Sequence, residues 1–294
     1  MLELLGTLIT LLYIGCALGT LALYVIWVYE RRNHPEDALP DGGTLAGPIR
    51  SVLAVVMETL AMFVLALTYP LRLYYDFRPL RAKEKGVTPV MLVHGYGANS
   101  ASMIFLHWML RRLGWPNVFA ISYTPPTANA RGLAQQVADR AERIMQACEA
   151  DKVDIVCHSM GGVLTRYALI NLDLADKVDV CVTLGSPHRG SRVAGLVPAM
   201  GSAAQMRHDS PFVREVAADG DTPGDARFYS LWSEFDNFVL PERSALISGN
   251  AKNLHVPYHG HCSLLYSPLV ARQVNDCLRE SRGATGKTAS DQGE

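Results

Sequence analysis

The segment HSMGG at residues 158–162 has the clearest chemical potential in this chain. An apolar run at residues 153–157 precedes it and helix-forming residues at 163–168 follow, so Ser159 stands on a strand-to-helix turn. A nucleophilic serine needs such a tight bend, small residues two positions away, and the free backbone N–H groups of a helix N-terminus. Gly161 meets this demand, whereas Cys157 stands where a second glycine is usual; its small side chain is expected to fit there, at the cost of some strain in the turn. The segment predicts nucleophilic catalysis by Ser159.

The rest of the chain after Gly86 contains the elements that would position this serine. Apolar residues at spacings of three and four predict a helix over residues 131–149. Short apolar runs predict strands at residues 90–93, 118–121, 153–157, 178–184, 228–232 and 253–257. Such alternation builds a mostly parallel sheet with helices on both faces, so the fold class is α/β. The catalytic domain is expected over residues 86–280, and a polar, disordered tail over residues 281–294.

Four blocks of sequence, in the expected order, resemble the α/β-hydrolase superfamily. They are similar to bacterial lipases with a small lid, both the Bacillus lipase and the triacylglycerol lipase kinds. The blocks are HGYG at residues 94–97, HSMGG at 158–162, LGSPHRGS at 184–191 and GHCSLL at 260–265. The resemblance covers residues 88–274 and implies the α/β-hydrolase fold and hydrolysis of carboxylic esters through an acyl-enzyme. It places His94, Gly95, His158 and Gly161 in the nucleophile turn and its supporting loop.

A serine hydroxyl needs a base and an orienting carboxylate, in the chain order serine, acid, histidine. The resemblance implies His261 as the base, because Gly260 precedes it and a Leu-Leu pair and a helix follow; His259 is the alternative. His188 precedes the acid and is interpreted as structural. In the segment SEFDNFVLP at residues 233–241, Asp236 matches the acid of the lipase loop, with Glu234 as the weaker alternative. Asp236 would accept a hydrogen bond from His261 and stabilise its imidazolium.

Negative charge that develops on a substrate carbonyl oxygen also needs donors. The resemblance assigns this oxyanion hole to the backbone N–H groups of Met160 and Tyr96. Such chemistry needs no cofactor, and no group of residues in the sequence has metal-ligand spacing; a structural calcium, known in some lipases, stays open.

The first 80 residues predict a membrane anchor. Residues 4–29 carry no charge and end in aromatic residues followed by Arg31 and Arg32, which is typical of a transmembrane helix; a cleaved signal peptide is the alternative. A second apolar stretch at residues 51–71 contains Glu58, so it spans, lies in the interface or packs on the enzyme; spanning is easiest if Glu58 faces the first helix. We expect a single helix or a hairpin in a bacterial inner membrane, with the side of the catalytic domain open.

Composition and the remaining pattern narrow the function further. With 27 Lys and Arg against 28 Asp and Glu, the net charge of −1 indicates no nucleic-acid partner. Residues 191–226 carry apolar residues among polar ones and are expected to form a lid. Anchor and lid favour a lipid or acyl-ester substrate, a phospholipid included. An acyl-thioesterase, an acyltransferase and a non-catalytic hydrolase-fold protein that binds a partner at the membrane are the alternatives.

Overall fold

The computed structural model describes residues 2–37, 39, 47–125, 127–196, 200–218, 224 and 226–288, with side chains up to residue 280. Six strands form one sheet in the order β2-β1-β3-β4-β5-β6, and every pair is parallel. The strands are β1 (Val90–Val93), β2 (Val118–Ile121), β3 (Val153–His158), β4 (Val178–Leu184), β5 (Arg227–Trp232) and β6 (Lys252–His255). All six predicted strands are confirmed.

The direction of winding changes between β1 and β3, which are neighbours in the sheet although β2 lies between them in the chain. The chain therefore leaves β1 and β3 toward opposite sides, and the crevice between such loops is where open α/β sheets bind ligands. The loops after β1 and β3 carry His94 and Ser159 respectively.

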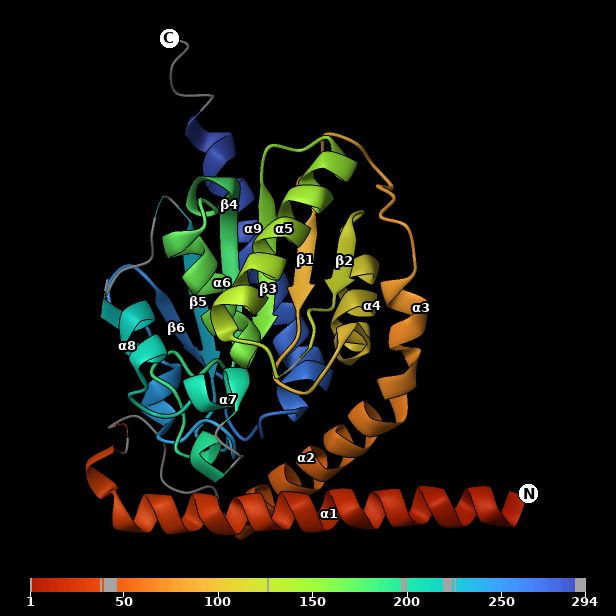
Figure 1. Cartoon of the computed structure of the whole chain (residues 1–294), viewed down its shortest axis with the longest axis vertical. Helices are drawn as coiled ribbons and strands as arrows, with labels where there is room; N and C mark the ends of the chain where they lie inside the picture. Colours follow the sequence, from red (N-terminus) through yellow and green to blue (C-terminus); the bar gives the residue numbers. More distant parts are fainter. Residues whose placement is uncertain are drawn as a thin grey trace.

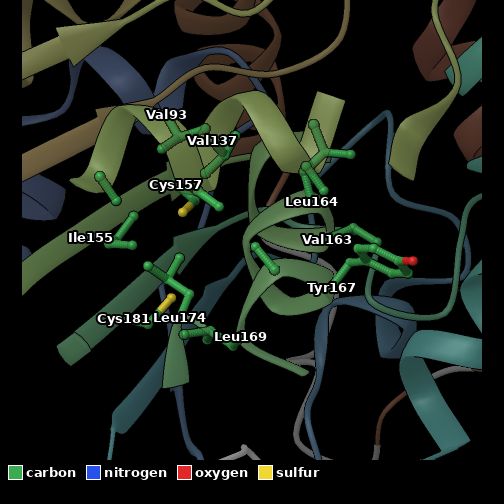
Figure 2. Close-up of a cluster of buried hydrophobic side chains, with 14 of the residues drawn as sticks. Val93, Val137, Ile155, Cys157, Val163, Leu164, Tyr167, Leu169, Leu174 and Cys181 are labelled. Carbon is green, nitrogen blue, oxygen red and sulfur yellow. The ribbon is translucent and has the colours of Figure 1, made fainter. Parts of the chain in front are cut away.

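Helices cover both faces of the sheet (Figure 1). One face carries α5 (Ala130–Cys148), α6 (Met160–Asn171) and α8 (Pro211–Ala218), and the other carries α4 (Ile104–Arg112) and α9 (Pro268–Thr288). Val93, Ile155 and Cys157 point from the strands toward residues of α5 and α6 (Figure 2). This is the α/β-hydrolase architecture that the sequence predicted, since parallel strands need apolar cover on both faces.

Helix α5 shows how local sequence sets an element. The Asn129 side chain accepts a hydrogen bond from the Arg131 N–H and caps the first turn. Leu133, Val137, Ala141 and Ile144 are wholly buried on the stripe that faces the sheet. The helix ends at Cys148, and the next residue, Glu149, adopts left-handed backbone geometry with φ 51°.

Two long apolar helices precede the sheet and lie beyond the edge at which its strands end (Figure 1). They are α1 (Leu2–Asn33) and α2 (Pro48–Thr68), which continues through a 3₁₀ turn into α3 (Arg72–Asp76). By length and by their mean hydropathy of 2.1, α1 and the segment Pro48–Asp76 are able to cross a membrane. They contact each other through an edge-to-face pair between Tyr13 and Phe63, with ring centroids 5.4 Å apart. One stripe of α2 also packs on the domain that contains the sheet.

The insert at residues 191–226 is more tightly packed than a lid requires. Its described part contains a 3₁₀ turn at Val193–Leu196, α7 (Gly201–Gln205) and α8. The side chains of Val193, Met206, Phe212 and Val213 are buried, and Phe212 packs on Tyr167 of α6 at 5.3 Å. Leu196 and Met200 are the apolar residues of the described insert that remain largely exposed, at 65% and 62%, while residues 197–199 lie outside the described residues. The buried part of the insert packs on the domain, and a lid formed by residues 191–226 stays a prediction.

The C-terminal helix is longer than predicted. Helix α9 continues to Thr288, past the boundary at residue 280 where we expected the polar tail to begin. Residues 281–288 contain no proline that would break the helix, although Gly283 and Gly286 disfavour it. The remaining residues of the tail, 289–294, lie outside the described residues.

Candidate active site

Ser159 occupies the sharp turn between β3 and α6. Its backbone has φ 55° and ψ −129°, a region that costs a residue with a side chain about 1–3 kcal/mol. The Ser159 N–H donates to the Leu184 carbonyl oxygen at 2.9 Å, which ties the turn to the end of β4. A strained strand-to-helix turn at the serine is the backbone geometry that the sequence motif predicted.

The Cys157 side chain lies in the hydrophobic core and does not crowd the serine turn. Its side chain is fully buried and its Sγ lies 3.1 Å from Thr165 Oγ1 on α6. The side chain points into the apolar cluster beneath the turn (Figure 2). A small side chain at this position therefore fits without glycine.

Two glycines allow the loop after β1 to pass directly beside the serine. A methyl group at Gly95 would lie 2.7 Å from Ser159 Cβ and 3.3 Å from Ser159 Oγ. A methyl group at Gly161 would lie 2.4 Å from the His94 carbonyl oxygen. Since no Cβ atom tolerates such distances, both positions require glycine for this close approach. The predicted supporting residues are thus brought together around Ser159.

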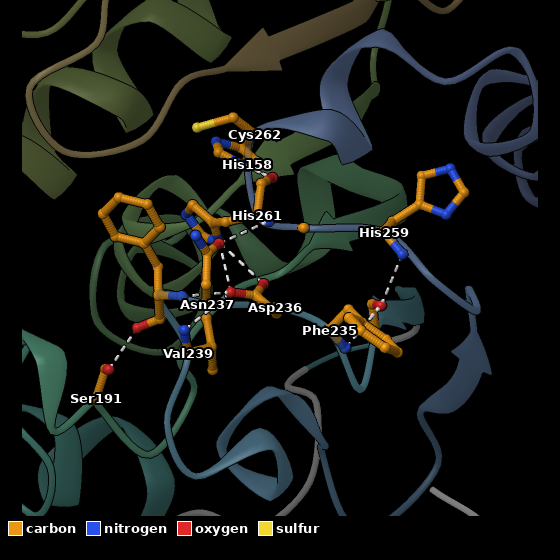
Figure 3. A network of polar contacts seen from close by, with 12 residues as sticks. His158, Ser191, Phe235, Asp236, Asn237, Val239, His259, His261 and Cys262 are labelled. Atoms are coloured by element: carbon orange, nitrogen blue, oxygen red, sulfur yellow. Dashed lines mark hydrogen bonds and ion pairs between the residues drawn. The ribbon is translucent and has the colours of Figure 1, made fainter. Parts of the chain in front are cut away.

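Asp236 and His261 form a buried pair near this turn (Figure 3). His261 Nδ1 lies 2.9 Å from Asp236 Oδ2, and it donates because a carboxylate only accepts. Asp236 Oδ1 also accepts the backbone N–H groups of Phe238 and Val239, both at 2.9 Å. These contacts fix the carboxylate, and with the proton on Nδ1 the neutral ring has its lone pair on the other nitrogen, Nε2.

Asp236 and His261 lie against Gly185, the residue that follows β4, and β4 is also the strand to which Ser159 is hydrogen-bonded. A methyl group at Gly185 would lie 2.6 Å from Asp236 Oδ2 and 3.2 Å from His261 Nδ1. Gly185 follows Leu184, whose carbonyl oxygen accepts the Ser159 N–H. The serine, acid and histidine therefore gather at the end of β4.

The alternative acid and base lie elsewhere. His259 is turned away from Asp236 (Figure 3), with Nδ1 2.8 Å from the Pro257 carbonyl oxygen and Nε2 2.9 Å from Ser267 Oγ. Glu234 pairs with His255 Nε2 at 2.7 Å. His188 is fully buried with Nε2 3.1 Å from Thr183 Oγ1, in keeping with its structural interpretation.

Burial and charge act in opposite directions on His261. Burial of the ring disfavours its protonated form, but the charge and hydrogen bond of Asp236, with a smaller contribution from the charge of Glu58, outweigh it. The net effect raises the pKa of His261 above its ordinary value. The imidazolium that forms when this histidine takes a proton is thereby stabilised.

Two further histidines support the loops in their neutral form. His158 Nε2 donates to the His261 carbonyl oxygen at 3.0 Å, and the two rings lie 4.6 Å apart. Burial, and then the nearby charge of His261, hold the pKa of His158 well below its ordinary value. Burial also lowers the pKa of His94 to about 4; its ring stacks on Tyr123 at 4.1 Å. Their neutral rings act as fixed hydrogen-bonding groups.

The two candidate oxyanion donors come from the loops that meet at the serine. Met160 begins α6, and the N–H groups of a first helical turn have no partner within the helix. Tyr96 follows Gly95, which touches the serine, and its own side chain is 41% exposed. Both N–H groups thus belong to segments beside Ser159, and their role as oxyanion donors stays a prediction.

The sequence predicted no group with metal-ligand spacing, but among the described residues His34, Glu36 and Asp37, just beyond the end of α1, lie close enough together to hold a metal ion. Asp37 already pairs with Arg192 Nη2 at 2.7 Å. The group lies outside the serine and histidine loops, so the chemistry described above does not use it.

Sequence reasoning missed one participant. Facing the first helix would have made it easiest for α2 to span a membrane, but Glu58 is instead wholly buried against the histidine loop. Its carboxyl oxygens accept the backbone N–H groups of Cys262 and Ser263, both at 2.8 Å. The single acidic residue in an apolar helix was a signal that a specific partner exists, but it did not identify that partner.

The sheet order, the strained serine turn and the buried Asp–His pair define the α/β-hydrolase fold with the side chains of a serine hydrolase. A protein family described as "Palmitoyl protein thioesterase" matches residues 89–220. The chain is 31% identical over 117 residues to a triacylglycerol lipase of Pseudarthrobacter phenanthrenivorans, covering 37% of this chain and 36% of that protein. A triacylglycerol lipase of Burkholderia plantarii is also 31% identical over 117 residues, with 37% and 32% covered. The chain thus spans about a third of the length of these relatives.

Solved structures share the fold. Lipase B of Aspergillus fumigatus superposes with a TM-score of 0.56 at 19% identity, over 63% of this chain and 51% of that one. The mature lipase BlEst2 of Bacillus licheniformis gives a TM-score of 0.50 at 21% identity, over 64% of this chain and 91% of that one. At such identities the likeness concerns the fold, and the two N-terminal helices lie outside the family match.

Proposed function

We propose that this chain is a membrane-anchored serine hydrolase of carboxylic esters, a lipase or esterase that acts through Ser159, His261 and Asp236. The observation that carries the proposal is the buried, hydrogen-bonded Asp236–His261 pair beside a serine held at φ 55° between β3 and α6. A strained nucleophile next to an oriented base is the arrangement that activates a hydroxyl.

In the first half of the reaction, Ser159 Oγ attacks the ester carbonyl carbon while its proton passes to His261 Nε2. The carbonyl oxygen becomes an anion and accepts the backbone N–H groups of Tyr96 and Met160. Asp236 accepts the Nδ1 proton throughout and stabilises the imidazolium. The intermediate then collapses: the bond to the alcohol oxygen breaks, His261 returns its proton to that oxygen, and the acyl group stays on Ser159.

In the second half, water replaces the alcohol. His261 takes a proton from the water as its oxygen bonds to the acyl carbon, and the same backbone donors receive the oxyanion. Collapse breaks the bond to Ser159 Oγ, which regains a proton from His261, and the carboxylic acid leaves. No cofactor enters either half.

Lipid is the substrate class that the surroundings favour. Helices α1 and α2 expose apolar side chains along much of their length, and both have the length and hydropathy of membrane spans. A tether of this kind concentrates membrane lipids and acyl esters, phospholipids among them, at the domain. Leu196 and Met200 offer exposed apolar contacts from the insert. Two relatives named triacylglycerol lipase agree with a lipid ester substrate.

Thioester hydrolysis is the second candidate. The match of residues 89–220 to a family described as palmitoyl protein thioesterase favours it. The same serine, histidine and donors would act on an acyl thioester, with a thiol in place of the alcohol as the leaving group. Acyl transfer differs only in the acceptor that replaces water.

Labelling with a fluorophosphonate tests the proposal. The full chain in detergent and its Ser159→Ala variant are treated with the reagent, the adduct is mapped by mass spectrometry, and both are assayed on oxygen esters and thioesters of graded chain length. Adduct on Ser159 of the parent and a loss of about 10³-fold or more in the variant's kcat are expected. A folded parent protein whose Ser159 stays unlabelled would favour the non-catalytic membrane binding protein.

A further inference from the structure

Helix α2 is hydrogen-bonded to the loop that carries the proposed base. The two carboxyl oxygens of Glu58 accept the N–H groups of Cys262 and Ser263, one each, at 2.8 Å. These amides belong to the two residues that follow His261. Glu58 is 0% exposed, so the contact is sealed from water and its electrostatic strength is not reduced by solvent.

The residue before His261 is shaped to the same side chain. A methyl group at Gly260 would lie 2.4 Å from Glu58 Oε2 and 2.5 Å from its carboxyl carbon. Only glycine at position 260 allows the histidine loop to approach α2 this closely. Glu58 holds both flanks of the histidine, through van der Waals contact on one side and hydrogen bonds on the other.

Helix α1 holds the loop that carries the proposed acid. Trp27 Nε1 donates to the Glu234 carbonyl oxygen at 3.1 Å, and the Tyr24 hydroxyl donates to the Phe235 carbonyl oxygen at 3.3 Å. The Trp27 ring also stacks on Phe235, with centroids 5.3 Å apart. These acceptors are the two residues that precede Asp236. Each apolar helix thus engages the backbone beside one member of the acid–base pair.

We propose that the N-terminal helices form a structural part of the catalytic centre, with Glu58 as the positioning residue for His261 and Trp27 as its counterpart for the Asp236 loop. This inference rests on the proposed function, because it assigns the helices a role in that same reaction. An anchor that only concentrated the enzyme at a bilayer would need no buried contact with these two loops.

Glu58 also acts on His261 through its charge. The titratable and charged groups that face His261 are Asp236 from the acid loop, Glu58 from α2 and His158 from the serine turn. Removing the Glu58 charge takes away one of the two carboxylates that favour the protonated ring. A glutamine in its place would also leave one loop N–H facing an amide N–H₂ group, which cannot accept it.

The test compares Glu58→Gln with the parent chain in the same detergent, using fluorophosphonate labelling rate, ester kinetics against pH, and thermal unfolding. We expect kcat to fall by about 10–100-fold, the labelling rate to fall with it, and the acid limb of the kcat/KM profile to move to lower pH. A defect confined to folding would not move that limb. Thr59→Ala is the matched control, because its buried hydroxyl bonds to Val55 of its own helix and its removal should leave kinetics unchanged.

Trp27→Phe keeps the ring stack and removes the indole N–H, and it serves as the second variant if Glu58→Gln does not fold. It should lower kcat by about tenfold with the acid limb in place, because no charge changes. Folded Glu58→Gln protein with kcat within about twofold of the parent, or with an unmoved acid limb, would overturn the inference. If Glu58→Gln does not fold, an unchanged kcat in Trp27→Phe would overturn the inference. Failure of the parent chain itself to label at Ser159 would instead reject the proposed function.

Discussion

Replacing Asp236 with asparagine changes one atom, and the structure predicts a large effect from it. Oδ1 of Asp236 accepts two backbone N–H groups, so in asparagine the amide oxygen must take that place. The amide N–H₂ then occupies the position of Oδ2, 2.9 Å from His261 Nδ1. Because both atoms cannot donate to each other, Nδ1 must become the acceptor and the ring proton must move to Nε2.

A ring with its proton on Nε2 has no lone pair for the proton of Ser159. A wrong tautomer of this kind lowers kcat by about 10⁴-fold, which corresponds to about 5.4 kcal/mol of transition-state stabilisation. The size and shape of the side chain are unchanged, so thermal unfolding should move little. The assay is steady-state hydrolysis of a short-chain nitrophenyl ester together with the rate of fluorophosphonate labelling.

Glu234→Gln is the matched control for this prediction. Glu234 is also buried and also bonds a histidine, but its partner is His255. Its replacement should leave kcat within about tenfold of the parent value. Full activity in Asp236→Asn, or a larger loss in Glu234→Gln than in Asp236→Asn, would refute the assignment of the acid.

Two further predictions follow from the same geometry. His261 accepts a proton only when neutral and its pKa is raised, so kcat/KM should fall as the pH drops through a value above about 6.5; a profile that stays flat from pH 8 to pH 5 would contradict a histidine base. Gly161→Ala places a methyl group 2.4 Å from the His94 carbonyl oxygen and should lower the free energy of unfolding by about 1–3 kcal/mol in chemical denaturation. Gly132→Ala on α5, where the added methyl group would meet no atom within 4 Å, should raise the free energy of unfolding by about 0.5–1 kcal/mol. Equal changes in the two variants would show that packing at the serine turn does not matter.

The sheet was predictable because its signals are local. Runs such as Val90–Val93 and Val178–Leu184 are apolar on both faces, which in a chain of this length indicates a buried parallel strand. The serine turn carries its own signal, because small residues must follow the nucleophile. Asp236 and His261 were also placed by chain order and local motif, and the structure brings these two side chains within hydrogen-bonding distance.

Features set by contacts far apart in the chain were not predictable. The Glu58 side chain has partners 204 and 205 residues away, and periodicity within α2 does not identify them. The insert shows the same limit: Phe212 and Val213 have a composition that suits a lid or a packed helix equally, and only the neighbouring Tyr167 settles that they pack. The sequence allowed the stretch at residues 51–71 to span a membrane, to lie in the interface or to pack on the catalytic domain, and only the long-range contacts of Glu58 show that one stripe of α2 packs on that domain.

The contacts between the N-terminal helices and the two loops also bear on the order in which the protein matures. A chain is synthesised from its amino end, so α1 and α2 leave the ribosome before residues 234–263 exist. Glu234, whose carbonyl oxygen accepts the Trp27 indole N–H, is synthesised 207 residues after Trp27. Cys262, whose N–H donates to Glu58, is synthesised 204 residues after Glu58. During that interval a buried glutamate has none of the partners described here, and the acid and histidine loops have not been made. The contacts of Trp27 and Glu58 with the acid and histidine loops can therefore form only late in synthesis of the chain.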